Sequence, residues 1–443
     1  MKPAPTRRNV LHGFTALAGG AALAACGAQA QGTAPAAETR NYAGTTLQLW
    51  GSYSASYRDV MLQHFDRFAQ LHAPGLKTEM QIYTNNDFIT KLTAALAGGT
   101  GPDFNRFKDH EAIDMAVLKA AAPIDGYLSK EKVIKLSDFT TQSVEGSKFQ
   151  NKTYGVPHHH QFAFLGWNKG LFRAAGINPD KTPETWSELR DYARRLTSLE
   201  KDQWGFQFQE FGEAREQHFN WYMEWVWRNG GDIWNRERTR NTMDSPESID
   251  TMQYMVDLMY ADKSTIPPDR SQINVNTGKL GMYMPNGAGV LNLKVTHPNL
   301  DFGVGPMPRQ KQFVTQLRHN TFTIMTNSKL PDLTWKAIVY MAGDEVMADW
   351  QADPAVSTVP VKKSLYEKAP WSDANSGWKP IIDVVRMPGN RPKPFIPGWD
   401  EYCNTIVVPA LYEAWRQTKS PKDALTEGAR KANLWLAQRP KLS

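Results

Sequence analysis

Cysteine is scarce in this 443-residue chain, which contains two such residues, Cys26 and Cys403. Cys26 lies in the N-terminal leader described below, so Cys403 has no second cysteine with which to pair, and a disulfide framework is excluded. A large apolar core must hold the fold instead. The roughly 400 residues that follow Cys26 are enough for two domains.

Long apolar runs and a strong charge excess are also missing. No stretch after Cys26 approaches the roughly 18 consecutive apolar residues of a membrane-spanning helix. The formal net charge is +6, and three of the positive charges, on Lys2, Arg7 and Arg8, precede Cys26, which leaves +3 for the rest of the chain. This small excess does not indicate a protein that binds nucleic acid.

The common catalytic and cofactor motifs do not occur. The chain has neither a G-x-x-x-x-G-K-[ST] phosphate loop nor a G-x-G-x-x-G fingerprint, and it has no G-x-S-x-G elbow. His110-Glu111 lacks the second histidine of a zinc-protease motif. We therefore expect no catalytic residue, no cofactor and no metal. An enzyme that uses two carboxylates stays open as an alternative, because the sequence does not give their separation.

The first residues are typical of an export signal. The stretch from Thr6 to Leu11 has the paired arginines of a twin-arginine signal, and Leu23-Ala24-Ala25-Cys26 resembles a lipobox. We predict a lipoprotein signal peptide over residues 1–26, with Cys26 lipidated, and a flexible linker over 27–40. The protein is then extracytoplasmic, at the cell surface or in a periplasm, and its acyl chains alone hold it at the membrane.

The residues that follow predict an α/β fold. Residues 45–50 alternate like a strand, 57–72 carry apolar residues at helical spacing, 79–83 form a second strand, and a helix begins near Asp87. Strands that alternate with helices form a parallel sheet. Ligands bind such sheets beyond the carboxyl ends of the strands, which here include Ser52.

Several stretches, in this order, resemble the extracytoplasmic solute-binding proteins of ABC importers, in the sugar-binding branch (family 1) that includes maltose-binding protein. The resemblance covers nearly the whole chain after the linker. The motifs are Tyr154-Gly155-Val156-Pro157, Gly166-Trp167-Asn168-Lys169-Gly170-Leu171-Phe172, Ala175-Gly176-Ile177 and Pro183-Glu184-Thr185-Trp186-Ser187-Glu188-Leu189. Where that family often has two glycines, this chain departs from the pattern with Arg318-His319-Asn320.

The resemblance implies a periplasmic-binding-protein fold of type II, in which two α/β lobes close on a ligand cleft by a hinge motion. By analogy, the N-terminal lobe takes residues 41–126 and 319–366, and the C-terminal lobe takes 127–318 and 367–443. The resemblance also implies a function. The protein would be a monomeric, lipid-anchored receptor that captures a carbohydrate, such as an oligosaccharide, and delivers it to the permease of an ABC importer without chemistry.

Two alternatives to a neutral sugar receptor stay open. One is a receptor for an anionic polyol, such as a glycerophosphodiester or an acidic sugar, and the other is an exported carbohydrate-active enzyme. A sugar receptor needs aromatic rings and hydrogen-bonding groups that are charged or amide. The residues expected to contact ligand are Ser52, Tyr53, Arg106, Lys108, Asp109, His158, His160, His218, Asn220, Trp221, Arg318, His319, Asn320, Trp399 and Tyr402.

The three consecutive histidines follow Val156-Pro157 and are expected to be extended. In an extended chain His158 and His160 point to one side and His159 to the other. Two histidines at this spacing can share a metal, but no cysteine or carboxylate cluster stands near them in the sequence. We therefore expect His158 or His160 to hydrogen-bond the ligand, since a neutral imidazole both donates and accepts.

Overall fold

The computed structural model describes residues 41–208, 215–267, 275–285, 299–356, 358–373 and 377–438. The predicted signal peptide 1–26, the linker 27–40 and the lipidation site Cys26 lie outside these residues. Within them, no helix is long and apolar enough to cross a membrane.

The first elements of the fold alternate between strand and helix, as predicted. β1 (Thr46–Gly51) pairs in parallel with both β2 (Lys77–Ile82) and β3 (Phe104–Lys108). Helix α1 (Ala55–His72) begins where the Ser54 side chain accepts a hydrogen bond from the backbone N–H of Tyr57. The remaining helices of this run are α2 (Asn85–Ala97) and α3 (Asp109–Val117).

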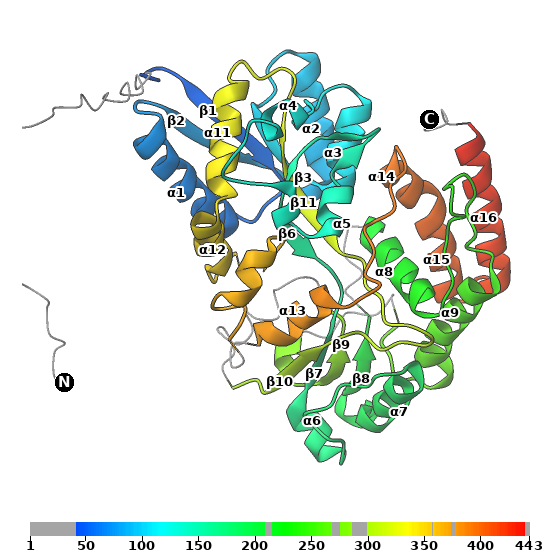
Figure 1. Cartoon of the computed structure of the whole chain (residues 1–443). Coiled ribbons are helices and arrows are strands. Elements are labelled where there is room, and N and C mark those ends of the chain that lie inside the picture. Colours follow the sequence, from blue (N-terminus) through cyan, green and yellow to red (C-terminus); the bar gives the residue numbers. More distant parts are fainter. Residues whose placement is uncertain are drawn as a thin grey trace, which may run out of the picture. The chain divides into compact units, whose positions relative to one another are not determined.

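Three strands from later in the chain complete a six-stranded sheet with the order β12-β6-β11-β3-β1-β2 (Figure 1). β11 (Arg318–Ile324) runs antiparallel to β3 and to β6 (Val156–Gln161), and β12 (Val359–Pro360) joins the outer edge of β6. The carboxyl ends of β1, β3 and β6 therefore meet the start of β11 at one edge. We call this sheet and its helices the first lobe.

A four-stranded sheet with the order β10-β7-β9-β8 forms the centre of the second lobe. Its strands are β7 (Leu165–Asn168), β8 (Trp204–Gln207), β9 (Leu280–Tyr283) and β10 (Phe302–Gly305). β7 is antiparallel to β9 and β10, and β8 is parallel to β9. The ends of β8, β9 and β10 therefore lie at the edge where β7 begins, directly after the chain leaves the first sheet.

Helices cover the second sheet and build an apolar core rich in tryptophan and methionine. A capping box formed by Thr185 and Glu188 starts α7. The helices of this lobe are α6 (Lys169–Ala174), α7 (Trp186–Leu196), α8 (Arg215–Arg228), α9 (Pro246–Val256), α14 (Trp399–Tyr402), α15 (Val408–Trp415) and α16 (Pro421–Ala437).

The other elements are short, pack around the first sheet or, in the case of α13 (Trp378–Arg386), pack against β10 of the second sheet. The helices are α4 (Asp125–Leu128), α5 (Thr141–Glu145), α11 (Pro331–Met341), α12 (Asp344–Ala352) and α13 (Trp378–Arg386), and β4 (Lys148–Phe149) and β5 (Lys152–Thr153) form a hairpin. Short 3₁₀ turns occupy Leu136–Asp138, Leu199–Lys201, Val275–Thr277 and Lys363–Glu367, and π turns occupy Asp257–Ala261 and Cys403–Val407.

The strand pairing corrects one predicted boundary between the lobes. Residue 127 was expected to start the second lobe, but β6 pairs with β11 and β12, so the chain stays in the first sheet through Gln161. The residues before β6 also pack with this sheet, since Ile134, Phe139 and Val144 belong to its core. The return to the first sheet begins with β11 at Arg318, next to the boundary predicted between 318 and 319.

Candidate ligand site between the two lobes

The edge of the first sheet that adjoins the second lobe carries polar side chains in place of the apolar ones found deeper in the sheet. Asn320 lies opposite both Lys108 and His159, and Arg318 lies opposite Gln161. Alternate residues of a strand share a face, so Arg318 and Asn320 of β11 lie on the same side as Lys108 of β3. The pairing of β3 with β11 therefore places three of the expected contact residues, Lys108, Arg318 and Asn320, on one face of the sheet.

Arg106, two residues before Lys108, also joins this cluster. Its guanidinium donates to the backbone oxygen of Ser52 at 2.9 Å and lies over the Tyr53 ring, with 4.7 Å between Cζ and the ring centroid. Arg106 is buried, with 7% of its surface exposed. The residues that follow β1 and the side chain of Arg106 from β3 are therefore in contact. They include three of the expected site residues, Ser52, Tyr53 and Arg106.

His159 connects Arg106 to Asn320. Its Nε2 atom is 2.5 Å from Asn320 Nδ2 and 3.4 Å from Arg106 Nη2, and both of these are donors. Nε2 is therefore an acceptor and Nδ1 carries the proton, which faces His158 Nδ1 at 2.8 Å. Burial, together with the nearby positive charge of Arg106, lowers the pKa of His159 well below its usual value, so this imidazole is neutral.

The directions of the three histidines differ from the expected alternation. The strand register places Asn320 opposite His159 but Thr321 opposite Pro157, so His158 is the extra residue of a β-bulge. His158 and His159 consequently share one face, where the His158 ring stacks on Phe322 at 4.3 Å between centroids. The expectation that His158 and His160 point the same way was wrong, because the sequence does not reveal the bulge.

His160 and His319 lie on the other face of the sheet and have protein partners. His160 Nδ1 donates to the Arg318 backbone oxygen at 3.2 Å, and its Nε2 is 2.9 Å from Thr140 Oγ1. His319 Nε2 is 2.8 Å from Ser147 Oγ. Burial lowers the pKa of His160 to about 3 and that of His319 to about 4. Whether either histidine touches ligand stays a prediction.

On the second lobe, helix α8 presents a polar stripe toward the first lobe. Glu216 and Asn220 are four residues apart and share a helix face. The Glu216 carboxylate forms an ion pair with Lys108, with 3.0 Å between Oε1 and Nζ. Burial alone would lower the pKa of Lys108, but Glu216 and Glu111 outweigh it and raise the pKa above its usual value.

His218 and Trp221 lie elsewhere on α8. His218 is buried, with its Nδ1 atom 3.1 Å from the hydroxyl of Tyr412, and its ring is 5.4 Å from that of Trp221. Both therefore pack among the helices of the second lobe. Their contact with ligand stays a prediction, whereas Glu216 of the same helix, which was not among the expected contact residues, reaches Lys108 of the first lobe.

Trp399 and Tyr402 also lie in the core of the second lobe and are fully buried. Tyr402 accepts a hydrogen bond from Asn241 Nδ2 at 2.7 Å, and the Trp399 ring packs on Phe219 at 5.3 Å between centroids. The Nζ atom of Lys393 lies 4.3 Å from the centroid of the Trp399 ring and so occupies one ring face.

A second group of charges joins the lobes at the start of α3. His110 Nε2 is 3.3 Å from Asp400 Oδ1, and Lys393 Nζ is 2.8 Å from His110 Nδ1 and 3.9 Å from Asp109 Oδ1. Burial and Lys393 favour a neutral His110, but Asp400 and Asp109 outweigh them and raise its pKa to about 9. Asp109 was expected from the sequence. Lys393 and Asp400 were not, although Asp400 directly follows Trp399.

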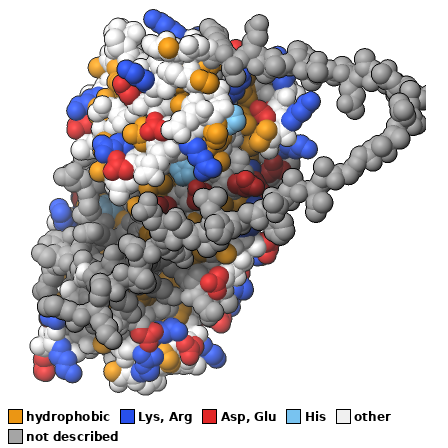
Figure 2. All heavy atoms as spheres, turned by 90° about the vertical axis from the view of Figure 1, so that its left-hand side faces the viewer, with side chains coloured by type: hydrophobic (Ala, Val, Ile, Leu, Met, Phe, Trp, Pro, Cys, Tyr) orange, Lys and Arg blue, Asp and Glu red, His pale blue; other side chains and the backbone are white. Residues whose placement is uncertain are grey.

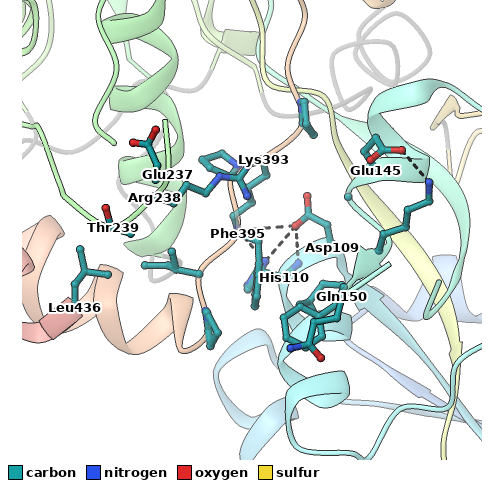
Figure 3. Close-up of a pocket in the computed structure, with 18 of the residues that line it drawn as sticks. Asp109, His110, Glu145, Gln150, Glu237, Arg238, Thr239, Lys393, Phe395 and Leu436 are labelled. Atoms are coloured by element: carbon teal, nitrogen blue, oxygen red, sulfur yellow. Dashed lines mark hydrogen bonds and ion pairs between the residues drawn. The ribbon is translucent and has the colours of Figure 1, made fainter. Parts of the chain in front are cut away.

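A cavity of about 1210 Å³ opens beside this second group. Asp109 and His110 line it from the first lobe, and Lys393 and Phe395 line it from the segment that crosses back to the second lobe (Figure 3). Arg238 approaches it from the second lobe. Figure 2 shows the face on the left-hand side of Figure 1, where Lys and Arg side chains are interspersed with Asp and Glu side chains.

We call the edge of the first sheet that adjoins the second lobe, together with the start of α8 that faces it, the interlobe edge. Several buried polar atoms there have no hydrogen-bond partner among the described residues. Such atoms are rare in folded proteins, so those that lie where the lobes meet could hydrogen-bond a ligand. They are Arg318 Nε and Nη2, Asn320 Oδ1, Asn220 Oδ1 and both amide atoms of Gln316. Across the described ranges, no three His, Cys, Asp or Glu side chains are grouped so that they could hold a metal ion.

The family model of bacterial extracellular solute-binding proteins matches residues 53–348. The chain belongs to this family. It is therefore an extracytoplasmic solute-binding protein, not an enzyme, and the family resemblance read from the sequence is confirmed.

Solved structures confirm the two-lobed α/β fold. An ABC substrate-binding protein of Listeria monocytogenes in complex with cycloalternan superposes with a TM-score of 0.78 at 20% identity, covering 89% of this chain and 100% of that one. A solute-binding protein of Thermotoga lettingae bound with α-D-tagatose also gives a TM-score of 0.78, at 19% identity, with 88% and 100% covered.

Relatives by sequence span most of the chain at low identity. A protein of Brucella abortus (strain 2308) is 26% identical over 374 residues, which are 81% of this chain and 86% of the relative. The sn-glycerol-3-phosphate-binding periplasmic protein of Pectobacterium atrosepticum is 21% identical over 440 residues, covering 89% of this chain and 92% of the relative.

Proposed function

We propose that this solute-binding protein is a lipid-anchored receptor that captures a carbohydrate between its two lobes and delivers it to the permease of an ABC importer. The observation that carries the proposal is the set of buried, unpartnered amide and guanidinium groups at the interlobe edge, from Asn320, Gln316, Asn220 and Arg318. Saccharides present many hydroxyls that both donate and accept, so they match such a set.

The strength of these contacts suits a transport receptor. A neutral hydrogen bond contributes roughly 0.5 to 1.5 kcal/mol, and one to a charged group up to about 3 kcal/mol. Several of them reach the roughly −8 kcal/mol of a micromolar complex after the cost of ordering the partners. The structural neighbours that bind cycloalternan and α-D-tagatose support a carbohydrate ligand.

Isothermal titration of the mature protein with a panel of mono- and oligosaccharides tests this function. We expect at least one saccharide to bind with a micromolar dissociation constant and to be recovered chemically intact by chromatography. Mass spectrometry of the ligand that copurifies with the protein is an independent readout. If a bound saccharide is returned cleaved, the receptor function is wrong and the alternative of a carbohydrate-active enzyme gains support.

The proposed lipid anchor on Cys26 is tested by a separate experiment. Two or more acyl chains on this residue would hold the protein stably at a membrane, because each buried methylene contributes roughly 0.8 kcal/mol. In cells that express the full chain, we expect the wild type in the membrane fraction and Cys26→Ala in the soluble extracytoplasmic fraction. Cys403→Ala is the matched control, since Cys403 is buried in the second lobe. Equal fractionation of all three proteins contradicts the anchor.

A second candidate is a receptor for an anionic polyol. Arg106 and Arg318 favour it, because both are buried and neither pairs with an acid in the described part of the chain. The relative in Pectobacterium atrosepticum that binds sn-glycerol 3-phosphate also supports it.

A further inference from the structure

Burial of an arginine or lysine side chain is unfavourable unless an opposite charge accompanies it, because the interior solvates a charge poorly. Each such residue in the described ranges can therefore be checked for a carboxylate partner. The buried ones are Arg106, Arg228, Arg318, Lys362 and Lys393.

Three of the five have such a partner within 4 Å. These pairs are Arg228 with Glu224 at 2.8 Å, Lys362 with Asp344 at 2.6 Å, and Lys393 with Asp109 at 3.9 Å.

Arg106 and Arg318 are the two exceptions, and they occupy neighbouring strands of one sheet. Lys108 lies opposite Asn320, and each arginine stands two residues before one member of this pair. Both arginines therefore face the same side of the sheet. Because β3 and β11 are antiparallel, Arg318 lies on the side of the Lys108–Asn320 pair toward the second lobe, and Arg106 lies on the side toward the interior of the sheet. The fold alone does not explain the uncompensated positive charge of Arg318 at the edge that adjoins the second lobe.

The hydrogen-bonding state of Arg318 supports this interpretation. Its side chain is 6% exposed, and its Nε and Nη2 atoms are buried without a partner in the part of the chain that the structure describes. Arg106 has protein partners for Nη1 and Nη2 but none for Nε. Arg318 therefore has the larger unused capacity, and its planar fork of donors matches the paired oxygens of a phosphate or a carboxylate.

The other polar groups nearby do not supply the missing negative charge. Glu216 is already paired with Lys108. His159 is neutral and accepts from Arg106 and Asn320, so it relays hydrogen bonds without compensating charge. Asn320 keeps a buried, unpartnered Oδ1 atom, which can accept a hydroxyl of the same ligand.

We propose that Arg318 forms a subsite for an anionic group carried by the ligand, either a phosphate or a carboxylate on a sugar or polyol. This subsite rests on the proposed function and narrows it. The ligand's anionic oxygens lie against the Arg318 guanidinium, and its hydroxyls lie toward Asn320.

Matched pairs of probes test the subsite at constant ionic strength. The pairs are glucose with glucose 6-phosphate, glucose with glucuronate, and glycerol with sn-glycerol 3-phosphate, titrated against the mature protein. We expect the anionic member of at least one pair to bind at least about tenfold more tightly than its neutral partner. The phosphate and carboxylate arms then distinguish the two sources of charge.

Arg318→Gln removes the charge and keeps hydrogen-bonding capacity. We expect it to weaken binding of the anionic probe by about tenfold to a hundredfold, the range for hydrogen bonds to a charged group, and to weaken binding of the neutral probe by less than about tenfold, because a neutral ligand loses only an uncharged hydrogen bond. Arg173→Gln is the matched control, because Arg173 is an exposed arginine paired with Asp301 on the surface of the second lobe. Equal affinities for the anionic and neutral probes, or an Arg318→Gln variant that keeps the anion preference, overturn the subsite.

Thermal unfolding decides the question even if none of these probes binds. We expect Arg318→Met without ligand to melt at a higher temperature than the wild type, because it removes an uncompensated buried charge. Inorganic phosphate should raise the melting temperature of the wild type but not of Arg318→Met. If Arg318→Met melts at a lower temperature than the wild type, and phosphate raises the melting temperature of both proteins equally, the subsite is contradicted. If saccharides bind without a preference for the anionic probe, this inference is wrong and the carbohydrate function stands. If phosphate raises the melting temperature but no saccharide binds, the carbohydrate function is wrong and the subsite stands.

Discussion

Lys108 and Glu216 form an ion pair between the two lobes, with 3.0 Å between Nζ and Oε1. Lys108 ends strand β3 of the first lobe, and Glu216 lies in the first turn of α8 of the second. Lys108 also lies 3.6 Å from Glu111 Oε1. The pair therefore joins the two lobes beside the candidate ligand site.

We predict that Glu216→Gln lowers the free energy of unfolding by about 1 to 3 kcal/mol, because it leaves Lys108 with one charged partner fewer in a nearly buried position. Urea denaturation measures this loss. A double-mutant cycle with Lys108→Met should return a coupling energy above about 0.5 kcal/mol, and Glu413→Gln, at an exposed ion pair with Lys419, is the control. Additive effects of the two substitutions would show that the pair is not energetically coupled.

Asn220 is predicted to contribute to ligand binding from α8. Its Oδ1 atom is buried without a partner in the described residues and lies one helical turn beyond Glu216. Asn220→Ala should weaken saccharide binding about threefold to tenfold, the value of one neutral hydrogen bond, as measured by titration calorimetry. Gln253→Ala on the exposed face of α9 serves as the control. Unchanged affinity in Asn220→Ala would place the ligand away from this helix.

The histidine triplet should separate into one residue that affects binding and two that affect stability. His159 contacts Arg106 and Asn320, so His159→Gln should weaken ligand binding while the protein stays folded. His158→Ala and His160→Ala should instead lower the free energy of unfolding by about 1 to 3 kcal/mol, since both are buried and packed against protein groups. Calorimetric titration and urea denaturation of the three variants provide the comparison. Full stability with lost binding in the double variant of His158 and His160 would support the original expectation instead.

Acid should destabilise the protein through its buried histidines. Burial lowers the pKa of His160 to about 3 and that of His319 to about 4, both below the roughly 6.5 of an unfolded chain. Their contribution is therefore fully present above pH 6.5 and is lost as the pH falls from 6.5 toward these folded-state values. Each histidine adds a slope of about 1.4 kcal/mol per pH unit near pH 5.

His160→Gln tests this pH dependence, because it removes one titrating group and keeps hydrogen-bonding capacity beside Thr140. Urea denaturation between pH 7 and pH 4.5 should show a slope about 1.4 kcal/mol per pH unit smaller than that of the wild type. His72→Gln, in the exposed last turn of α1, is the control. An identical pH dependence of wild type and His160→Gln would mean that His160 is charged in the folded protein.

Gly205 is predicted to be irreplaceable in β8. A Cβ atom at this position would lie 1.8 Å from the backbone oxygen of Ala193, so α7 would have to move away from the second sheet. Gly205→Ala should cost about 3 kcal/mol or more, at the upper end of the range for overpacking. Gly126→Ala, where a Cβ meets nothing within 4 Å, is the control and should change stability by less than about 0.5 kcal/mol. Thermal unfolding compares them directly.

The sequence alone was sufficient for the family and for much of the local structure. The alternation from residue 45 onward and the motif that begins at Tyr154 depend on neighbours close in the chain, so they can be recognised directly in the sequence. The sequence also predicted the location of four polar residues at one edge of the sheet, because the carboxyl ends of parallel strands meet there. These residues are Ser52, Tyr53, Arg106 and Lys108.

Only the tertiary structure decided which side chains meet across the lobes. Lys108 finds Glu216 at a separation of 108 residues, and His159 finds Asn320 at a separation of 161. Local patterns carry no information about such contacts. The bulge at His158 reverses the expected alternation for the same reason, since it depends on the register with β11. Arg318 could be selected from the sequence as a polar residue at a hinge, but only the packing of the sheet shows that it has no carboxylate partner among the described residues.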